Sequence, residues 1–187
     1  SIKKHRSTLT AEKRKFGGFD DSAGRRYYIA DLFIRIADYK GTIVYKKWFN
    51  QNFPDDVGGP LLSLYWSVAY FDLGKITETK IYTIDTAFQN IYFHKLLLDR
   101  EIIRFDMYNY GCDMLEFAKS MVKEIKKVST KQYIEWLATF IETDEYKEPI
   151  NKLIALNKLL KEKNNTDKRS KLFDQIRDLE IMNKERK

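Results

Sequence analysis

At 187 residues the chain is long enough for one domain with a sizeable core, and its formal net charge is +7. Its single cysteine, Cys112, excludes an internal disulfide, and two histidines with one cysteine do not make a zinc-ligand set, so we expect a cytoplasmic protein without metal or other cofactor. Glycine and proline are scarce, which disfavours an all-β fold and predicts an all-α one, and the apolar run at residues 61–71 is too short to span a membrane.

The two ends of the chain are basic and the body is nearly neutral. Residues 1–20 hold six Lys/Arg against two acids, residues 158–187 hold ten against six, and the 137 residues between hold 18 against 19. We predict a basic polar arm over residues 1–20 and a single helical domain over 21–187. Basic ends of this kind indicate solvated tails, and nucleic-acid binding through them is the alternative.

Residues 23–56 have the pattern of a helical hairpin. Ile29, Leu32, Phe33 and Ile36 recur at spacings of three and four, which indicates one buried helical face. Asp21 or Ser22 could cap this helix. A turn is expected at residues 38–41, followed by a second helix that ends at the proline at position 54.

Residues 60–93 have the same organisation. Pro60 suits the first turn of a helix, and residues 61–73 are apolar on nearly every side, which predicts neighbours on more than one face. Gly74 is the expected stop. Ile81, Ile84 and further apolar residues then continue a helical stripe to about residue 98.

The remainder predicts a connector and four more helices. Residues 99–108 are a connector with at most one helical turn, and apolar periodicity marks helices near residues 115–125, 133–141, 150–160 and 172–179. The third of these is entered near Pro149, and a polar loop is expected at residues 164–167. The prediction is eight helices in antiparallel hairpins, the later ones over about 109–183.

The two early hairpins match one another with a shift of 37 residues. The matched pairs are Ala30 with Ser67, Phe33 with Tyr70, Ala37 with Gly74, Tyr39 with Ile76, and Thr42 with Thr79. With the closing Pro54, this order of small and aromatic residues resembles a tetratricopeptide repeat (TPR). The family's early tryptophan is absent, and no closing proline follows the second copy. The resemblance implies a short TPR-like α-solenoid of stacked hairpins.

Proteins of this family bind peptides or helices in a concave groove lined by the first helix of each repeat. The resemblance therefore implies an adaptor or scaffold with a protein or peptide partner. The implied partner-binding residues are Tyr27, Asp31, Ile34, Arg35, Leu64, Val68, Phe71 and Asp72. The alternative for Leu64, Val68 and Phe71 is that later helices cover them and they belong to the core.

One set of residues imitates a metal-dependent nuclease. Asp72, Glu78 and Lys80 have the spacing in which carboxylates hold Mg²⁺ and a lysine steadies the attacking water. That chemistry needs Glu78 and Lys80 on a strand, whereas Ile81, Ile84 and the following apolar residues have a helical period. We therefore expect no catalytic residue and no enzyme, with the nuclease as the remaining alternative.

Overall fold

The computed structural model describes residues 1–19, 21, 23–162 and 166–186, and these form an all-helical structure without a strand. Part of the polar loop expected at 164–167 therefore lies outside the described residues, as does Ser22. The α-helices are α1 (Ile2–Phe16), α2 (Arg25–Arg35), α3 (Tyr39–Asn52), α4 (Gly59–Asp72), α5 (Ile76–Gln89), α6 (Phe93–Leu97), α7 (Leu115–Val128), α8 (Lys131–Phe140), α9 (Asp144–Lys161) and α10 (Thr166–Lys184), with a 3-10 helix at Tyr110–Asp113.

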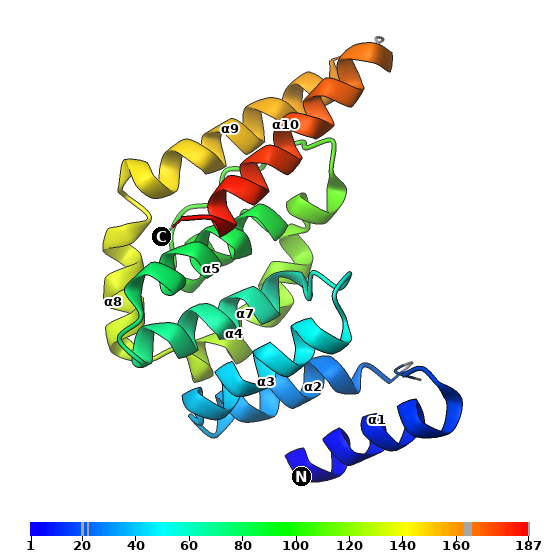
Figure 1. Ribbon diagram of the computed structural model, residues 1–187. Coiled ribbons are helices and arrows are strands. Elements are labelled where there is room, and N and C mark those ends of the chain that lie inside the picture. The colour runs from blue at the N-terminus through cyan, green and yellow to red at the C-terminus, as the bar shows by residue number, and fades with distance from the viewer. Residues whose placement is uncertain (20, 22, 163–165, 187) are drawn as a thin grey trace.

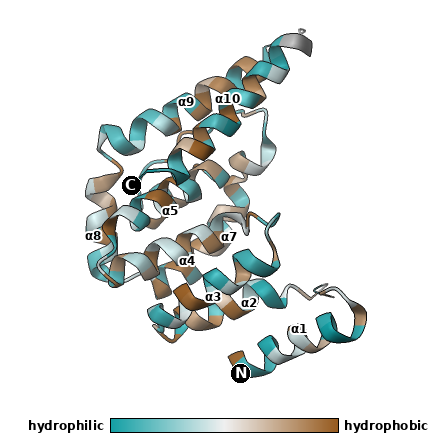
Figure 2. Cartoon of the chain, in the orientation of Figure 1, coloured by the Kyte–Doolittle hydropathy of each residue, from teal (hydrophilic) through white to brown (hydrophobic). Residues whose placement is uncertain are grey.

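Helix pairs follow one another through the molecule. Helices α2 and α3 pack together, α3 packs on α4, and α4 packs on α5; α5 then contacts α9 and α10, which pair with each other (Figure 1). The predicted hairpins 23–56 and 60–93 thus correspond to α2–α3 and α4–α5. Hydrophobic and hydrophilic residues alternate along most of these helices (Figure 2), as expected where one face of each helix is buried. Within the described residues, no helix is both long and apolar enough to cross a bilayer.

Short polar side chains set the starts of the first hairpin's helices. The N-cap residue of α2 is Gly24, and the carboxylate of Asp21, three residues earlier, accepts hydrogen bonds from the backbone N–H groups of Arg25 and Arg26 at the start of the helix, as predicted. Asp38 accepts from the backbone N–H of Gly41 at 2.8 Å and caps α3. The turn predicted at 38–41 therefore lies slightly earlier, and α3 already begins at Tyr39.

Helix α4 is the centre of the core. Nine consecutive residues, 62 to 70, are buried, because α2, α3, α5 and α8 all pack on this helix. The two small residues Ser67 and Ala69 are fully buried within this run. A helix that is apolar all round must be covered all round, and this prediction is confirmed. Gly74 follows α4 with a φ of 71°, which confirms it as the helix stop.

Helices α7 and α8 cover one side of the first two hairpins. Helix α7 contacts α2, and α8 contacts α4. The ring of Phe71 on α4 lies 5.6 Å from the ring of Tyr133 and 5.5 Å from that of Trp136, both on α8. The hydroxyl of Ser67 is 3.0 Å from the Tyr133 hydroxyl. Part of the α4 surface expected to line a groove is therefore occupied by the chain itself.

The basic arm predicted for residues 1–20 is largely helix α1, which packs on α2 and is not a solvated tail. Leu9 is fully buried, and the ring of His5 lies 5.1 Å from that of Tyr28 in an edge-on contact. Arg6 lies over the ring of Trp48 at 5.4 Å, so one side of the helix is docked through mixed polar and apolar contacts.

Two other helix boundaries differ from the prediction. The stripe expected to reach residue 98 is interrupted at Asn90, which is extended, and the chain resumes as the short helix α6. Pro149 lies inside α9 and not at its entrance. A proline has no N–H for the carbonyl four residues earlier, that of Glu145, and this carbonyl instead accepts a hydrogen bond from Arg186. The described residues thus hold ten α-helices, where eight were predicted.

Candidate functional site

A pocket of about 560 Å³ lies between α2, the start of α4 and α7, and we call it the tyrosine pocket. Its size is within the range of ordinary ligand sites. The helices that form it come from the first two hairpins and from α7, so the pocket exists only where these helices pack together. Its lining residues are Tyr27, Tyr28, Asp31, Arg35, Gly58, Gly59, Leu61, Leu62, Tyr65 and Met121.

The pocket has an exposed aromatic edge and a buried apolar floor. Tyr28 is 48% exposed and Tyr27 is 36% exposed, whereas Leu62 and Tyr65 below them are 2% and 5% exposed. Leu61 and Met121 are half-buried at its sides. Tyrosine offers a large, rigid contact surface, and methionine adapts its shape to an inserted group. The arrangement therefore suits an apolar side chain from another molecule.

A charged rim borders the pocket near the middle of α2. The carboxylate of Asp31 accepts a hydrogen bond from the Tyr65 hydroxyl at 2.8 Å and another from Arg35 Nε at 2.7 Å. Arg35 also pairs with Glu124 of α7 at 3.0 Å. The hydrogen bond with Asp31 raises the pKa of Arg35, and desolvation raises the pKa of Tyr65. Both carboxylate oxygens of Asp31 are thus satisfied, which fixes the orientation of this rim.

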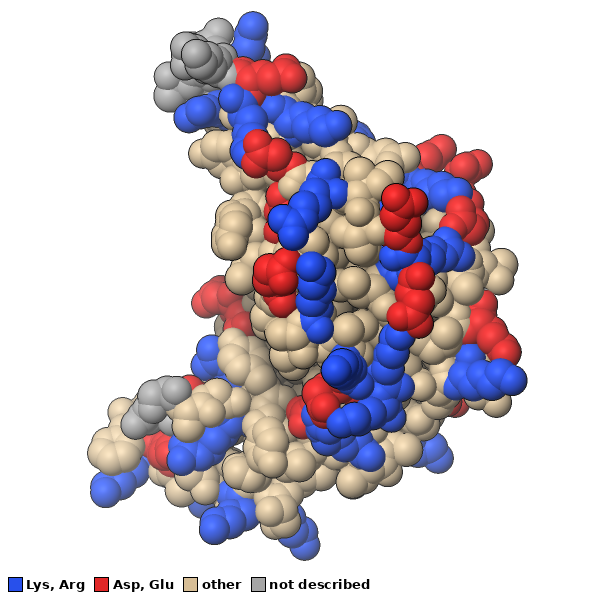
Figure 3. All heavy atoms as spheres, turned by 180° about the vertical axis from the view of Figure 1, so that it is seen from behind, with Lys and Arg blue, Asp and Glu red and all other residues tan. Residues whose placement is uncertain are grey.

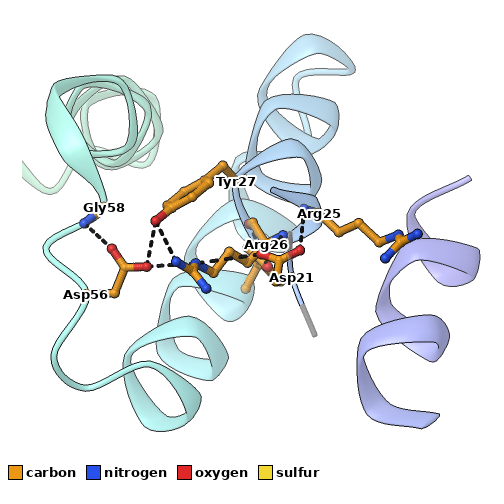
Figure 4. Close-up of polar contacts among 7 residues, drawn as sticks. Asp21, Arg25, Arg26, Tyr27, Asp56 and Gly58 are labelled. Carbon is orange, nitrogen blue, oxygen red and sulfur yellow. Dashed lines mark hydrogen bonds and ion pairs between the residues drawn. The ribbon is translucent and has the colours of Figure 1, made fainter. Parts of the chain in front are cut away.

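A second polar network holds the other end of the pocket (Figure 4). Arg26 Nε lies 2.7 Å from a carboxylate oxygen of Asp56, and its Nη2 donates to the Tyr27 hydroxyl at 2.9 Å. The Tyr27 hydroxyl donates to Asp56 at 2.7 Å, and the other oxygen of Asp56 accepts from the backbone N–H of Gly58 at 2.8 Å. Burial of the Tyr27 ring, followed by its bond to Asp56, raises the pKa of Tyr27. The network ties α2 to the loop that enters α4.

Gly58 is required at this entry for two reasons. Its φ is 78°, a left-handed conformation that costs other residues strain. A Cβ at this position would also lie 2.8 Å from Cδ1 of Leu62, closer than carbon atoms pack. The loop at Gly58 and the side chain of Leu62 in the pocket floor therefore lie so close together that only glycine fits at position 58.

The pocket brings together three of the eight residues predicted to bind a partner: Tyr27, Asp31 and Arg35. Ile34 is only 2% exposed and belongs to the core. Asp72 is exposed at the other end of α4, outside the pocket, and partial desolvation raises the pKa of its carboxyl group.

Two residues of the apolar strip on α4, Leu64 and Val68, are fully buried in the core, as in the alternative that the sequence left open, so the implied groove is wrong at these two positions. Phe71 is half-buried against α8. Sequence reasoning missed Leu61 and Tyr65 as lining residues, because nothing in the sequence separates them from the other apolar residues of α4. It also missed Met121, which only the packing of α7 brings to the pocket.

The nuclease-like set has a different geometry from the one that its chemistry needs. Glu78 and Lys80 lie on α5, a helix, and not on a strand. Lys80 pairs with Glu145 at 2.6 Å, and Glu78 lies 3.9 Å from Lys75. Across the described residues, no group of three or more His, Cys, Asp or Glu side chains has the arrangement of a metal site.

Charges on the body of the molecule are mostly paired. On the face shown in Figure 3, Lys and Arg lie beside Asp and Glu over much of the surface. Such pairs include Lys126 with Asp99 at 2.6 Å. Helix α1 differs, because a shallow hollow along it is lined by Lys3, Arg6, Arg14 and Lys15 and by no acid.

Comparison with known proteins adds no assignment to this geometry. No family model matches the chain, and no curated protein or solved structure was found to be similar to it.

Proposed function

We propose that the chain is a protein-interaction module, built from TPR-like hairpins at 23–56 and 60–93, that holds an apolar side chain of a protein partner in the tyrosine pocket. The observation that carries the proposal is the pocket itself, where exposed tyrosines surround an apolar floor. Aromatic residues, methionine and arginine are enriched in protein interfaces, and all three types line this pocket. No catalytic step is assigned to the chain.

The packing of the helices supports the TPR-like part of the proposal. Helix α2 contacts α3 within the first hairpin and also α4, the first helix of the second. In a stack of helical hairpins, each first helix touches its own partner and the next first helix. The sequence predicted a partner in a groove along α4, but α8 covers that part of α4. We therefore propose that the partner binds at the tyrosine pocket, which remains open between α2 and the start of α4.

The charged rim restricts the partner. Asp31, Arg35 and Glu124 at one end and Asp56 and Arg26 at the other present both signs of charge in fixed positions. We propose a short amphipathic helix or peptide that inserts one large apolar residue and carries polar residues on either side. Because the rim ion pairs are partly exposed, they contribute orientation more than affinity.

Affinity isolation of partners from the native host tests the proposal. Leu61→Asp places a charge in the pocket, and Tyr28→Ala removes part of its edge; we expect both to lose the partner that the wild type retains. Val44→Asp is the matched control, because Val44 is 59% exposed on α3 and outside the pocket. Melting temperatures must stay close to that of the wild type. Retention of the same partner by both folded variants would refute the site.

Nucleic-acid association is the second candidate, and the four cations of the α1 hollow, which has no acid among its lining residues, favour it. If these four side chains neutralise phosphates of a single strand, the logarithm of the affinity should fall with the logarithm of salt concentration with a slope near about −3. The same isolation, performed with and without nuclease, separates the two candidates. A partner that survives nuclease and depends on Leu61 supports protein docking, and loss of all partners on nuclease treatment supports nucleic acid.

A further inference from the structure

A second cavity, of about 570 Å³, lies on a different part of the molecule from the tyrosine pocket and shares no residue with it. One wall is the irregular segment 100–106, which we call the strap, and the opposite wall is helix α9. Ile91, at the turn before α6, also lines it. Neither the TPR-like repeats nor the proposed docking site accounts for this cavity.

The strap is held at both ends. At one end Arg100 pairs with Glu142, and its Nη2 donates to the carbonyl of Ala138 at 3.0 Å. At the other end Asp106 pairs with Lys161, and the backbone N–H of Phe105 donates to the Tyr92 hydroxyl at 3.0 Å.

These anchors make the strap run along α9. The six residue steps from 100 to 106 span at most roughly 20 Å when extended. The fourteen steps of helix from 147 to 161 span roughly 21 Å. The cavity itself borders the first part of this helix, because its lining residues on α9 run from Tyr146 to Ile154, roughly 12 Å of helix. The space between strap and helix therefore extends along α9, with one end near Glu142 and the other near Ile154.

The two ends of the cavity differ in polarity. Arg100 and Lys147 both pair with Glu142, so they meet at the first end. Lys95 lines the cavity as well, and it forms no ion pair within the part of the chain that the structure describes. The second end is apolar, with Ile103 and Phe105 from the strap.

The charges at the first end leave a cation available for an anionic ligand. Three cations line the cavity, Lys95, Arg100 and Lys147, against two acids, Glu101 and Glu142. Glu142 is shared by two of the cations, and the bonds from Lys147 and Arg100 lower the pKa of this carboxyl, which keeps it ionised. Glu101 is exposed. Lys95 therefore remains without a counter-charge beside a chain of apolar side chains that includes Ile91, Ile141, Ile150 and Ile154.

We propose that this cavity binds a carboxylate with an unbranched alkyl chain. The carboxylate pairs with Lys95 at the charged end, and the alkyl chain lies between the strap and α9 over the isoleucine side chains. A charged head suits the free cation, and an unbranched tail suits an elongated apolar space better than a compact ring system does. The strap lies across the ligand and is held by its two ion pairs.

Calorimetric titration of the full chain with octanoate, decanoate and laurate, each below the concentration at which it forms micelles, tests the proposal. We expect one saturable site per chain and an affinity that rises about fourfold for each added methylene until the cavity is full. Decanol, which has the same tail as decanoate and no charge, should bind at least about tenfold more weakly. Absence of saturable binding, or equal binding of decanol and decanoate, would overturn the proposal.

Two variants locate the head and the tail. Lys95→Met should weaken decanoate about tenfold or more while leaving decanol unchanged, and Lys152→Met, on the exposed side of α9 outside the cavity, should change neither. Ile154→Trp fills the apolar end and should weaken laurate more than octanoate. Because that variant can also disturb the fold, the ratio of the two affinities is the readout. An unchanged decanoate affinity in folded Lys95→Met overturns the assignment of the head.

Discussion

His94 shows how a single buried side chain couples the stability of this protein to pH. Its ring is 1% exposed, its Nδ1 lies 2.8 Å from the Tyr146 hydroxyl, and its Nε2 has no partner among the described residues. Desolvation lowers the pKa of His94 from 6.5 to about 3. A charged imidazolium in this position would be buried without a counter-charge, so the folded protein keeps the ring neutral.

The consequence is a loss of stability in mild acid. The unfolded chain binds a proton at His94 below its ordinary pKa of 6.5, whereas the folded chain does so only near 3. The stabilising contribution is therefore fully present above pH 6.5 and decreases as the pH falls toward 3, by about 3 kcal/mol at pH 4. Denaturant unfolding at pH 7 and pH 4 measures it, with His94→Gln as the comparison. Equal pH dependence in the variant and the wild type would contradict this origin.

Small residues between helices decide how closely the elements pack. Ala30 on α2 and Ala69 on α4 are both fully buried. Helices approach closely where one of them presents only a methyl group. In the match between the two early hairpins, Ala30 corresponds to Ser67, another small residue, and Ser67 is also fully buried.

Overpacking tests this arrangement. Ala30→Leu and Ala69→Leu each add three heavy atoms to a filled site, and we expect each to lower the free energy of unfolding by about 1–3 kcal/mol. Chemical denaturation gives the value, and Ala11→Leu on the exposed side of α1 is the matched control. Midpoints that stay at the wild-type value in both buried variants would show that the helices do not meet at these alanines.

Later helices of the chain cover much of the apolar surface of the first two hairpins. Helix α8 packs on α4 through Tyr133 and Trp136, and α7 packs on α2 beside the Arg35–Glu124 pair. The hydroxyl of Tyr133 is fully enclosed, with Ser67 as a hydrogen-bond partner, and burial raises the pKa of this tyrosine to about 12. Helices α7 and α8 are therefore packed as part of the same structure as the first two hairpins.

Because α8 covers α4, an acidic substitution on α4 should unfold the protein and not merely release a partner. If Leu64 lined an open groove, Leu64→Asp would remove a partner and leave the fold intact. Because Leu64 is fully buried, we expect Leu64→Asp to bury an unpaired carboxylate and abolish cooperative unfolding at neutral pH. Circular dichroism during heating measures this, with Val57→Asp, at 75% exposure, as the control. A cooperative transition close to that of the wild type would show that Leu64 tolerates a charge and would favour the open groove again.

Sequence periodicity by itself determined the helical class and the first two hairpins. A run of apolar residues at spacings of three and four has only one way to bury a continuous face, so α2 to α5 were predictable, as were the role of Asp21 at the start of α2 and the stop at Gly74. Helix α1 was missed because its buried side combines one leucine with His5 and Arg6, a pattern that resembles a polar tail until α2 and α3 supply aromatic partners.

Only the tertiary structure decided which apolar residues remain open to a ligand. Tyr27, Asp31 and Arg35, three of the residues predicted to bind a partner, line the tyrosine pocket. Leu64, Val68 and Phe71 were predicted with them because all six lie on the first helices of the two hairpins, but these three are buried or half-buried. Whether such a face is a groove or core depends on where α7 and α8 fold back, and that depends on contacts between residues far apart in the chain, such as Phe71 with Trp136. The periodicity of the sequence shows that one face of a helix is apolar, whereas only the packing of the helices shows which residues cover that face.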